Sequence, residues 1–326
     1  MKTQQKTTNT ISRPFLLRMA ATITSGRISQ KVILQELKEL ITLAAWLNRS
    51  AYEAAARKLF AFFSMPASQM SVKALPQKIF SDGNGKLNFL NWSTLPGVNC
   101  PGAGACFQWI KKAAGTFQGW CYTFASWRNA YAFTRQLLNT ILERGPVYRL
   151  LIIESLKQQL QRKIYRDQKA VPFRLYVDGD FPDLEILRFW MDTLKQFPKL
   201  KAYGYSKSLH LFKELDQSGY IWPENYALNI SSGGLYYQSS TAQYVRNMAI
   251  YRGDFIAVSV DNKTLKNWNA QKLTTEDRRA IRSKVNARKV FICPKYCGDC
   301  TLIKENPHAC GNKEKFKNIS IVLPVH

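Results

Sequence analysis

Histidine is scarce in this sequence of 326 residues, which contains only three: His210, His308 and His326. So small a pool gives little basis for a Ser–His–Asp triad or a Cys–His pair, so nucleophilic hydrolases of those kinds are not indicated. No phosphate-cradling sequence of the GxxxxGKS or GxGxxG type precedes an expected helix, which argues against a nucleotide-driven motor.

Long apolar runs are missing as well. No stretch of about 18 apolar residues occurs, so we expect no segment that crosses a membrane. Residues 1–13 are polar and lack the apolar stretch of a signal peptide, which favours a cytoplasmic protein. In that reducing compartment the seven cysteines are better interpreted as metal ligands or buried thiols than as disulfides.

Acidic residues are few: 22 Asp and Glu stand against 47 Lys and Arg, a formal net charge of +25. The excess is uneven, because residues 171–262 are close to neutral while the segments on both sides of them are strongly basic. So large an excess favours a polyanion, which ranks DNA or RNA first among partners. A lysine-rich surface that only keeps the protein soluble is the alternative.

Short apolar runs alternate with helical patterns from residue 173 onward, which indicates βαβ crossovers. The expected strands are 173–177, 201–205, 226–230, 255–260 and 289–292. The expected helices among them are 182–197, 208–218 and 274–288. We therefore predict an α/β fold with a mostly parallel sheet, either open or forming a partial (β/α) barrel.

The N-terminal 80 residues are predicted to form a helical extension, because apolar residues recur at helical spacing across 28–48. A second helix is expected from Ser50 to about Phe63, with Ser50 and Glu53 as a capping box. The predicted organisation is a helical extension at 1–80, an α/β core at 81–292 and a Cys-rich tail at 293–326 packed on the core.

Four cysteines lie within 18 residues of the tail: Cys293, Cys297, Cys300 and Cys310. Such spacing lets thiolates turn back onto one metal, so we expect Zn²⁺ or a 4Fe-4S iron–sulfur cluster there, with His308 as a substitute ligand. The CxxxCxxC spacing at 293–300 is that of the cluster ligands in radical-SAM enzymes. In those enzymes the motif normally follows the first strand of the domain, whereas here it follows the last expected strand. Reduced, partly buried cysteines without metal are the alternative.

A second group of cysteines, Cys100, Cys106 and Cys121, has longer gaps and is a weaker metal signal. It either completes the tail site or is only structural.

Asp178 and Asp180 follow an expected strand, and Lys207 follows the next strand along the chain. Because α/β sheets place their sites at the carboxyl ends of strands, these three are weak catalytic candidates. Two close carboxylates could hold Mg²⁺, whereas Lys207 could meet an anion. Helix capping and pairing with arginine are the structural alternatives for the two aspartates.

Basic residues gather on expected helices before and after the neutral middle of the chain. Their guanidinium and ammonium groups suit contacts with phosphate. The candidates are Arg128, Arg135, Lys157, Arg162, Lys163, Arg278, Arg279, Arg282, Lys284, Arg288 and Lys289. A solvated basic surface that binds nothing is the alternative.

An ordered set of short motifs spans about 81–310: GlyAsnGlyLysLeu (83–87), LeuProGly (95–97), CysProGlyAla (100–103), CysTyr (121–122), AspGlyAspPhe (178–181), TyrSerLysSer (205–208) and the tail cysteines. The set resembles the "gene product 88" family of uncharacterised phage- and plasmid-borne proteins. The resemblance implies an origin in a mobile element and carries no activity with it. Fertility inhibition is one role open to such a plasmid gene.

These observations favour a non-enzymatic regulatory protein of a plasmid or phage that binds nucleic acid. An iron–sulfur or other metal-dependent enzyme acting on nucleic acid is the alternative. Inhibition of transfer-gene expression is one regulatory role that such a protein could have.

Overall fold

The chain divides into two units in the computed structural model, which describes residues 11–25, 28–82, 89–97, 99–107, 110–111, 117–118, 121–294, 300 and 309–324. The helical unit comprises Met1–Ile79, Thr94–Val98 and Tyr122–Lys157. The sheet unit comprises Phe80–Ser93, Asn99–Cys121 and Gln158–His326. The helical unit thus contains most of the extension predicted for 1–80 together with the later segment Tyr122–Lys157.

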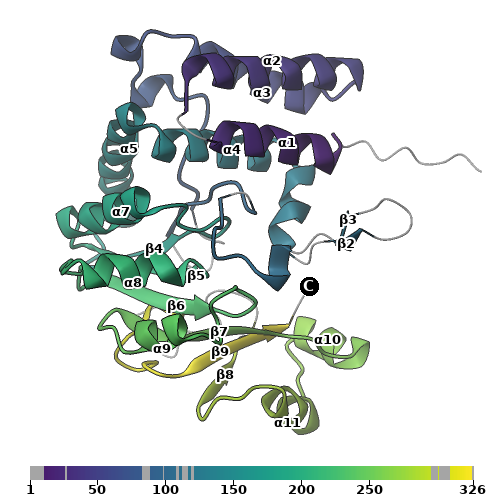
Figure 1. The fold of residues 1–326 in the computed structure, drawn as a ribbon, viewed down its shortest axis with the longest axis vertical. Coiled ribbons are helices and arrows are strands. Elements are labelled where there is room, and N and C mark those ends of the chain that lie inside the picture. Colours follow the sequence, from purple (N-terminus) through teal and green to yellow (C-terminus); the bar gives the residue numbers. More distant parts are fainter. Residues whose placement is uncertain are drawn as a thin grey trace, which may run out of the picture. The chain divides into compact units, whose positions relative to one another are not determined.

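One parallel sheet of seven strands, counted within the described residues, organises the sheet unit in the order β1-β4-β5-β6-β7-β9-β8 (Figure 1). The strands are β1 Leu90–Asn91, β4 Val171–Leu175, β5 Leu200–Ser206, β6 Tyr226–Ser231, β7 Tyr251–Val258, β8 Val290–Ile292 and β9 Ser320–Pro324. All five strands expected from the sequence are among them, which confirms an α/β fold with a mostly parallel sheet. A separate antiparallel pair consists of β2 Ile110–Lys111 and β3 Phe117–Gln118.

Strands β4 to β7 lie in chain order, as in a (β/α) barrel, but the C-terminal strand breaks that order. Strand β9 pairs with both β7 and β8, so it lies between two strands that precede it in the sequence. The sequence analysis did not predict β9. Its side chains Ile321 and Val322 are fully buried, which accounts for its central position.

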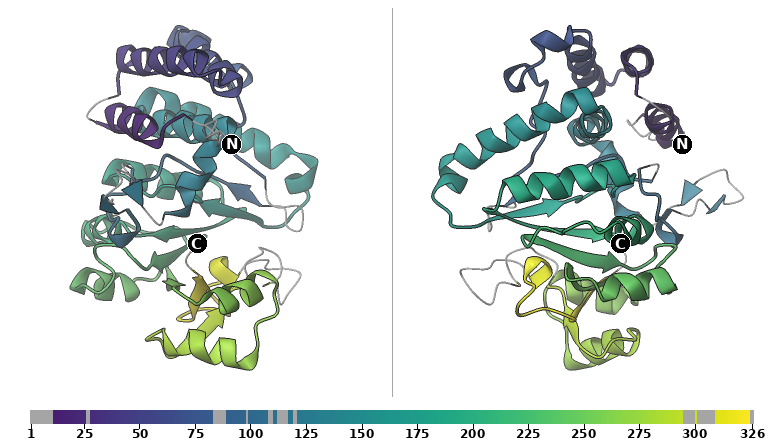
Figure 2. Two further views of the ribbon diagram at one scale, coloured as in Figure 1. Left: turned by 90° about the vertical axis from the view of Figure 1, so that its right-hand side faces the viewer. Right: turned by 60° about the vertical axis from the view of Figure 1, so that its left-hand side comes forward.

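Three helices cover one face of the sheet: α7 Leu184–Gln196, α8 Leu209–Gln217 and α9 Ser240–Arg246 (Figure 2). Trp190 of α7 contacts Phe173 of β4, and Phe212 of α8 stacks with Tyr226 of β6. Alternation along each strand places Arg174, Tyr203, Tyr205 and Asn229 on the opposite face. We call that opposite face the tail face, because Asn229 Nδ2 there donates to the carbonyl of Cys310 over 3.0 Å.

Helices α10 Asn262–Asn269 and α11 Thr275–Ser283 adjoin β7 and β9. Trp268 and Ile281 are buried in one apolar cluster with Val258 and Val322. The helix expected at 274–288 ends five residues early, at Ser283. The chain turns there, and the turn brings Val285 into the same cluster.

The helical unit contains α1 Arg13–Thr24, α2 Gln30–Trp46, α3 Ser50–Phe63, α4 Ala130–Arg144 and most of α5 Arg149–Gln161; α6 Lys163–Arg166 follows in the sheet unit. The capping box expected at Ser50 is wrong. Asn48 has a left-handed backbone conformation (φ 54°), and the N-cap of α3 is the next residue, Arg49. The side chain of Arg49 makes no capping hydrogen bond. Glu53 instead pairs with Arg57 over 2.8 Å. No described helix is long and apolar enough to cross a bilayer.

Short 3-10 helices complete the described secondary structure. They are Ala67–Gln69, Val72–Ala74, Ala105–Phe107, Tyr122–Arg128, Pro146–Tyr148 and Ala309–Gly311. The last of these carries Cys310 and lies against β5 and β6 on the tail face, where Gly311 closely approaches the Tyr203 ring.

Candidate functional site

The carboxyl ends of β4 and β5 meet at Asp180. This side chain is 3% exposed, and each of its carboxylate oxygens accepts two hydrogen bonds. Oδ1 accepts from the Phe181 N–H and the Ser206 hydroxyl, each at 2.8 Å. Oδ2 accepts from the N–H groups of Lys207 (2.7 Å) and Ser208 (3.2 Å). Asp180 therefore braces the turn after β5, in a network of donors that leaves little room for a metal ion.

Burial raises the pKa of Asp180, while the hydrogen bond from the Lys207 amide acts most strongly in the other direction. Asp178, two residues earlier, is only partly buried. The two aspartates are thus unlike in environment although they are neighbours in sequence. A shared role as metal ligands receives no support from this arrangement.

The Lys207 side chain reaches across to β6, where its Nζ donates to the Ser231 hydroxyl over 2.8 Å. Ser231 belongs to the AsnIleSerSerGlyGly segment (229–234), which the sequence places at the end of an expected strand. The structure therefore brings together the ends of β4, β5 and β6, as their motifs predict.

The CysProGlyAla motif packs directly on this edge of the sheet. A Cβ added to Gly102 would lie 1.9 Å from the Lys207 carbonyl oxygen, so only glycine fits there. The amide of Leu235 donates to the Gly102 carbonyl over 2.9 Å, which holds the motif to the segment after β6. Cys106 is buried a few residues further on, and burial raises the pKa of its thiol against the opposing effect of Lys207.

Of the first cysteine group, Cys106 and Cys121 lie near enough to interact electrostatically, and Cys100 is partly buried. No three His, Cys, Asp or Glu side chains within the described ranges form a group that could hold a metal ion. The structure thus gathers two members of this group beside Lys207 without forming a complete ligand set.

Three of the four tail cysteines share one apolar cluster. Cys293, Cys300 and Cys310 pack around the buried side chains of Ala309, Phe316 and Ile321. Cys297 and His308, the other ligand candidates, lie outside the described residues. The fold thus brings thiols that are up to 17 positions apart in sequence into one neighbourhood on the tail face.

Cys310, like Cys293 and Cys300, is partly buried. Burial raises its pKa to about 11, while Arg252 and a hydrogen bond from Tyr205 oppose that rise. The thiol is therefore protonated at neutral pH. Cysteine is a ligand type of zinc and iron–sulfur sites, but Cys293, Cys300 and Cys310, as described, do not form a group that could hold a metal ion.

The six basic candidates after residue 277 are all exposed to solvent. Within the described part of the chain none of them pairs with a carboxylate, although Lys284 Nζ donates to the Ser259 carbonyl over 2.6 Å. Three of them lie on α11, where Arg278 and Arg282 are one turn apart. The six are Arg278, Arg279, Arg282, Lys284, Arg288 and Lys289.

Two of the other basic candidates pair with carboxylates. Arg162 is bound to Asp82, with Nη1 2.6 Å from the carboxylate, and Lys157 pairs with Glu154 over 2.7 Å. Lys163 and Arg128 are exposed, whereas Arg135 is partly buried in α4. Arg128, Arg135 and Lys157 belong to the helical unit, whereas Arg162 and Lys163 belong to the sheet unit.

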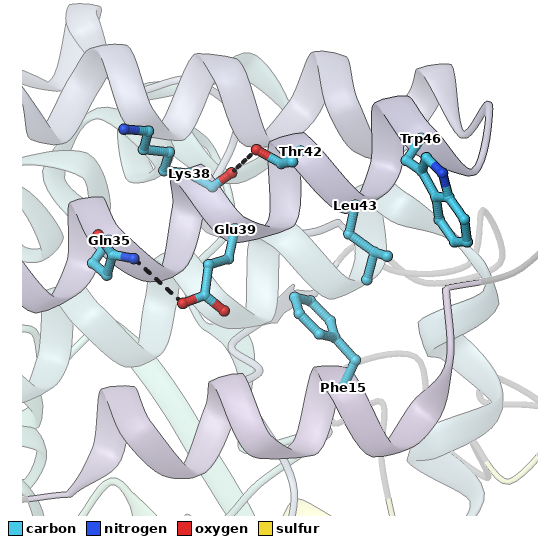
Figure 3. Close-up of a pocket in the computed structure, with 7 residues that line it drawn as sticks. All are labelled: Phe15, Gln35, Lys38, Glu39, Thr42, Leu43 and Trp46. Carbon is cyan, nitrogen blue, oxygen red and sulfur yellow. Dashed lines mark hydrogen bonds between the residues drawn. The ribbon is translucent and has the colours of Figure 1, made fainter.

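A groove of about 490 Å³ on the helical unit is a further surface feature (Figure 3). It lies between α1 and α2, where Phe15 faces Leu43, and Trp46 at its rim is 77% exposed. Glu39 also lines it, with one carboxylate oxygen 2.6 Å from the Arg18 guanidinium. The lining combines three apolar side chains with Gln35, Lys38, Glu39 and Thr42, so it carries no excess of positive charge that would favour phosphate.

The chain was compared with protein families and with individual proteins. A family model described as Gene product 88 matches residues 56–314, which confirms the resemblance drawn from the ordered motifs. No curated protein and no solved structure matches the chain.

Proposed function

Since the chain belongs to the Gene product 88 family, we propose that it is a nucleic-acid-binding regulator of a phage or plasmid, acting in the cytoplasm. The observation that carries this proposal is the basic surface formed by α10, α11 and the segment that follows them. We call residues 261–289 the basic lobe.

The basic lobe has a large excess of positive charge. It contains nine basic residues and three acidic ones, Asp261, Glu276 and Asp277. Asp261 and Asp277 are both engaged at helix N-termini, where they accept hydrogen bonds from backbone amides. With nine basic and three acidic residues, the lobe keeps a formal net charge of +6, and two of its three carboxylates are held at helix N-termini.

Helix α11 presents its basic groups on the side away from the core. Asp277 and Ile281 face inward, whereas Arg278, Arg279 and Arg282 are exposed. Guanidinium groups one helical turn apart can contact neighbouring phosphates, each through two parallel N–H donors. Such contacts hold a protein on a nucleic-acid backbone without reading its sequence.

The test is the salt dependence of binding. The double variant Arg278→Ala, Arg282→Ala should bind duplex DNA more weakly at every salt concentration. The slope of log K against log salt concentration should flatten by about one to two units, since each lost phosphate contact removes about 0.9. A matched control is Lys31→Ala, Lys58→Ala, which removes the same charge from exposed positions on α2 and α3.

A folded double variant with the wild-type slope would place the nucleic-acid surface elsewhere. Single-stranded RNA and duplex DNA of equal length, compared in the same assay, separate the two classes of nucleic acid. Inhibition of transfer-gene expression is the biological role that we propose to examine first in cells.

An enzyme with a metal at Asp178 and Asp180 is the weaker candidate, because both Asp180 oxygens are already engaged by protein donors. We therefore propose binding rather than catalysis as the function.

A further inference from the structure

Three segments that are far apart in the sequence meet around the side chain of Lys207. The AspGlyAspPhe motif supplies Asp180, which accepts from the Lys207 amide over 2.7 Å. The CysProGlyAla motif supplies Gly102, which packs against the Lys207 carbonyl. The end of β6 and the segment after it supply Ser231 and Gly234. Nucleic-acid binding by the basic lobe uses none of these residues, so their convergence requires a separate explanation.

The aliphatic stem of Lys207 is closely packed by glycine backbone. A Cβ added to Gly234 would lie 2.9 Å from the Cβ and 3.1 Å from the Cγ of Lys207. Gly104 lies in turn against the next segment, since its added Cβ would be 2.8 Å from the Gly233 carbonyl oxygen. A side chain at either position would displace its neighbours. This packing therefore restricts where the stem of Lys207 can run.

The ammonium group at the end of this stem is fixed by one hydrogen bond. Lys207 Nζ donates to the Ser231 hydroxyl over 2.8 Å, and Ser231 is 7% exposed. Within the described residues Lys207 forms no ion pair, because the oxygens of Asp180 accept from backbone amides and the Ser206 hydroxyl. An ammonium has three N–H donors, so two of them remain for another acceptor.

Ser231 adds a second donor at the same place. Its oxygen accepts the hydrogen bond from Lys207, so its own O–H remains to donate. Donors on two atoms that are 2.8 Å apart can bind two oxygens of one phosphate or carboxylate group. Hydrogen bonds between an ammonium and such an anion are shorter and stronger than those between neutral groups.

Two polar atoms at the start of α8 lack a hydrogen-bond partner among the described residues. They are Ser208 Oγ and His210 Nδ1, and Ser208 is fully buried. Buried polar groups in proteins are nearly always hydrogen-bonded, so an unpartnered hydroxyl next to Lys207 is a second indication that this place receives a polar ligand.

We propose that Lys207 and Ser231 form a binding site for an oxyanion, the phosphate or carboxylate group of a small ligand. In α/β proteins ligands bind outside the carboxyl ends of parallel strands, and this pair lies at those ends of β5 and β6. Lys207 attracts the anion by its charge, and Ser231 orients it through its O–H. Because the stem of Lys207 is already packed, little side-chain freedom is lost on binding.

This site differs from the basic lobe in the kind of anion that it suits. One ammonium beside the Asp180 carboxylate provides no excess of positive charge for a polyanion, but it suffices for a single anionic group. The inference therefore does not depend on nucleic-acid binding by α11.

Thermal unfolding in increasing sodium phosphate or sodium acetate, at an ionic strength held constant with sodium chloride, tests the site. A ligand that binds only the folded chain raises the unfolding temperature as its concentration rises. At least one of the two anions should stabilise the wild type, and a response to phosphate or to acetate identifies the class of ligand. A wild type that responds to neither anion would overturn the proposal.

Lys207→Met keeps an unbranched stem and removes the ammonium. Its affinity for the anion should be at least tenfold lower, because a hydrogen bond to a charged group is lost. Lys201→Met removes the same charge from an exposed position on β5 and should respond as the wild type does. General effects of phosphate on protein hydration act on all these chains alike. Equal stabilisation of Lys207→Met and wild type would overturn the proposal.

Ser231→Ala and Gly234→Ala test the geometry while the charge is kept, and they provide the measurement if Lys207→Met does not fold. Ser231→Ala removes the O–H donor and the acceptor that fixes Nζ, whereas the added Cβ of Gly234→Ala displaces the stem of Lys207. Each should weaken anion binding several-fold. Wild-type affinity in both folded variants would overturn the site.

The double variant Arg278→Ala, Arg282→Ala separates this site from the basic lobe. Its response to phosphate and acetate should equal that of the wild type, even where its affinity for duplex DNA falls. If the double variant loses the response, the anion binds at the basic lobe and the assignment to Lys207 is wrong.

Discussion

Thr274 and Asp277 cap α11 reciprocally: the Thr274 N–H donates to Asp277 Oδ2 over 3.0 Å, and the Asp277 N–H donates to Thr274 Oγ1 over 3.1 Å. The same carboxylate also accepts hydrogen bonds from Thr264 and Asn267 of α10. One side chain therefore begins α11 and ties it to α10, so it sets the position of the arginines that follow.

Replacing Asp277 with alanine should weaken nucleic-acid binding, although the change removes a negative charge from the basic lobe. The loss of the capping box frees the first turn of α11 and its link to α10, so the arginines are held less firmly. Affinity for duplex DNA at fixed salt is the measurement. Tighter binding by the folded variant would show that net charge matters more than the geometry of the lobe.

Acid should remove the contribution of Asp277 to folding. Hydrogen bonds from the Thr274 amide and the Asn267 side chain lower the pKa of Asp277 to about 2, below its ordinary value of 3.8. A lowered carboxyl pKa stabilises the folded state above pH 4, and this contribution disappears as pH falls toward 2. The stability difference between wild type and Asp277→Asn should shrink over that range. Tryptophan emission during denaturant unfolding at each pH measures this difference.

If the difference in stability between wild type and Asp277→Asn stays constant from pH 6 to pH 2, the negative charge of Asp277 does not contribute to folding, and only the hydrogen bonds that both side chains can make would matter. Glu276→Gln, at an exposed neighbouring position, is the matched control and should show little change over the same range.

Asp180→Asn should destabilise the sheet unit by about 3 kcal/mol. Each carboxylate oxygen accepts two hydrogen bonds, so an amide NH₂ in either orientation would face two donors and leave them unsatisfied. Thermal unfolding of the variant measures the loss. Asp167→Asn, which removes an exposed carboxylate, should stay within about 0.5 kcal/mol of wild type.

Gly102→Ala should disrupt the contact between the CysProGlyAla motif and β5, because the added Cβ would overlap the Lys207 carbonyl. We expect a loss of about 3 kcal/mol or detachment of the segment, which faster proteolysis near residue 102 would reveal. Gly219→Ala is a useful comparison. Its Cβ would meet no atom within 4 Å, so only the positive φ of 79° opposes it, at about 1 kcal/mol. Equal effects of the two substitutions would contradict the packing argument.

The sequence by itself determined the features that depend on neighbouring residues. Apolar runs such as 201–205 and 226–230 predicted β5 and β6, because side-chain burial on both faces of a parallel strand leaves a continuous apolar signal. The helix expected from residue 274 begins where the structure caps α11, because that cap is made by Thr274 and Asp277, which are only three positions apart. The motif order likewise indicated the family that the comparison confirmed.

Only the tertiary structure decided which distant residues meet. Arg162 donates hydrogen bonds to Asp82, which lies 80 positions earlier in the sequence. Arg252 of β7 lies near Cys310 because β9, which follows the cysteine tail, pairs with β7. The partners of these two arginines could not be predicted, since contacts between distant segments depend on the path of the chain and on which side chains the fold buries, and no local sequence pattern records either.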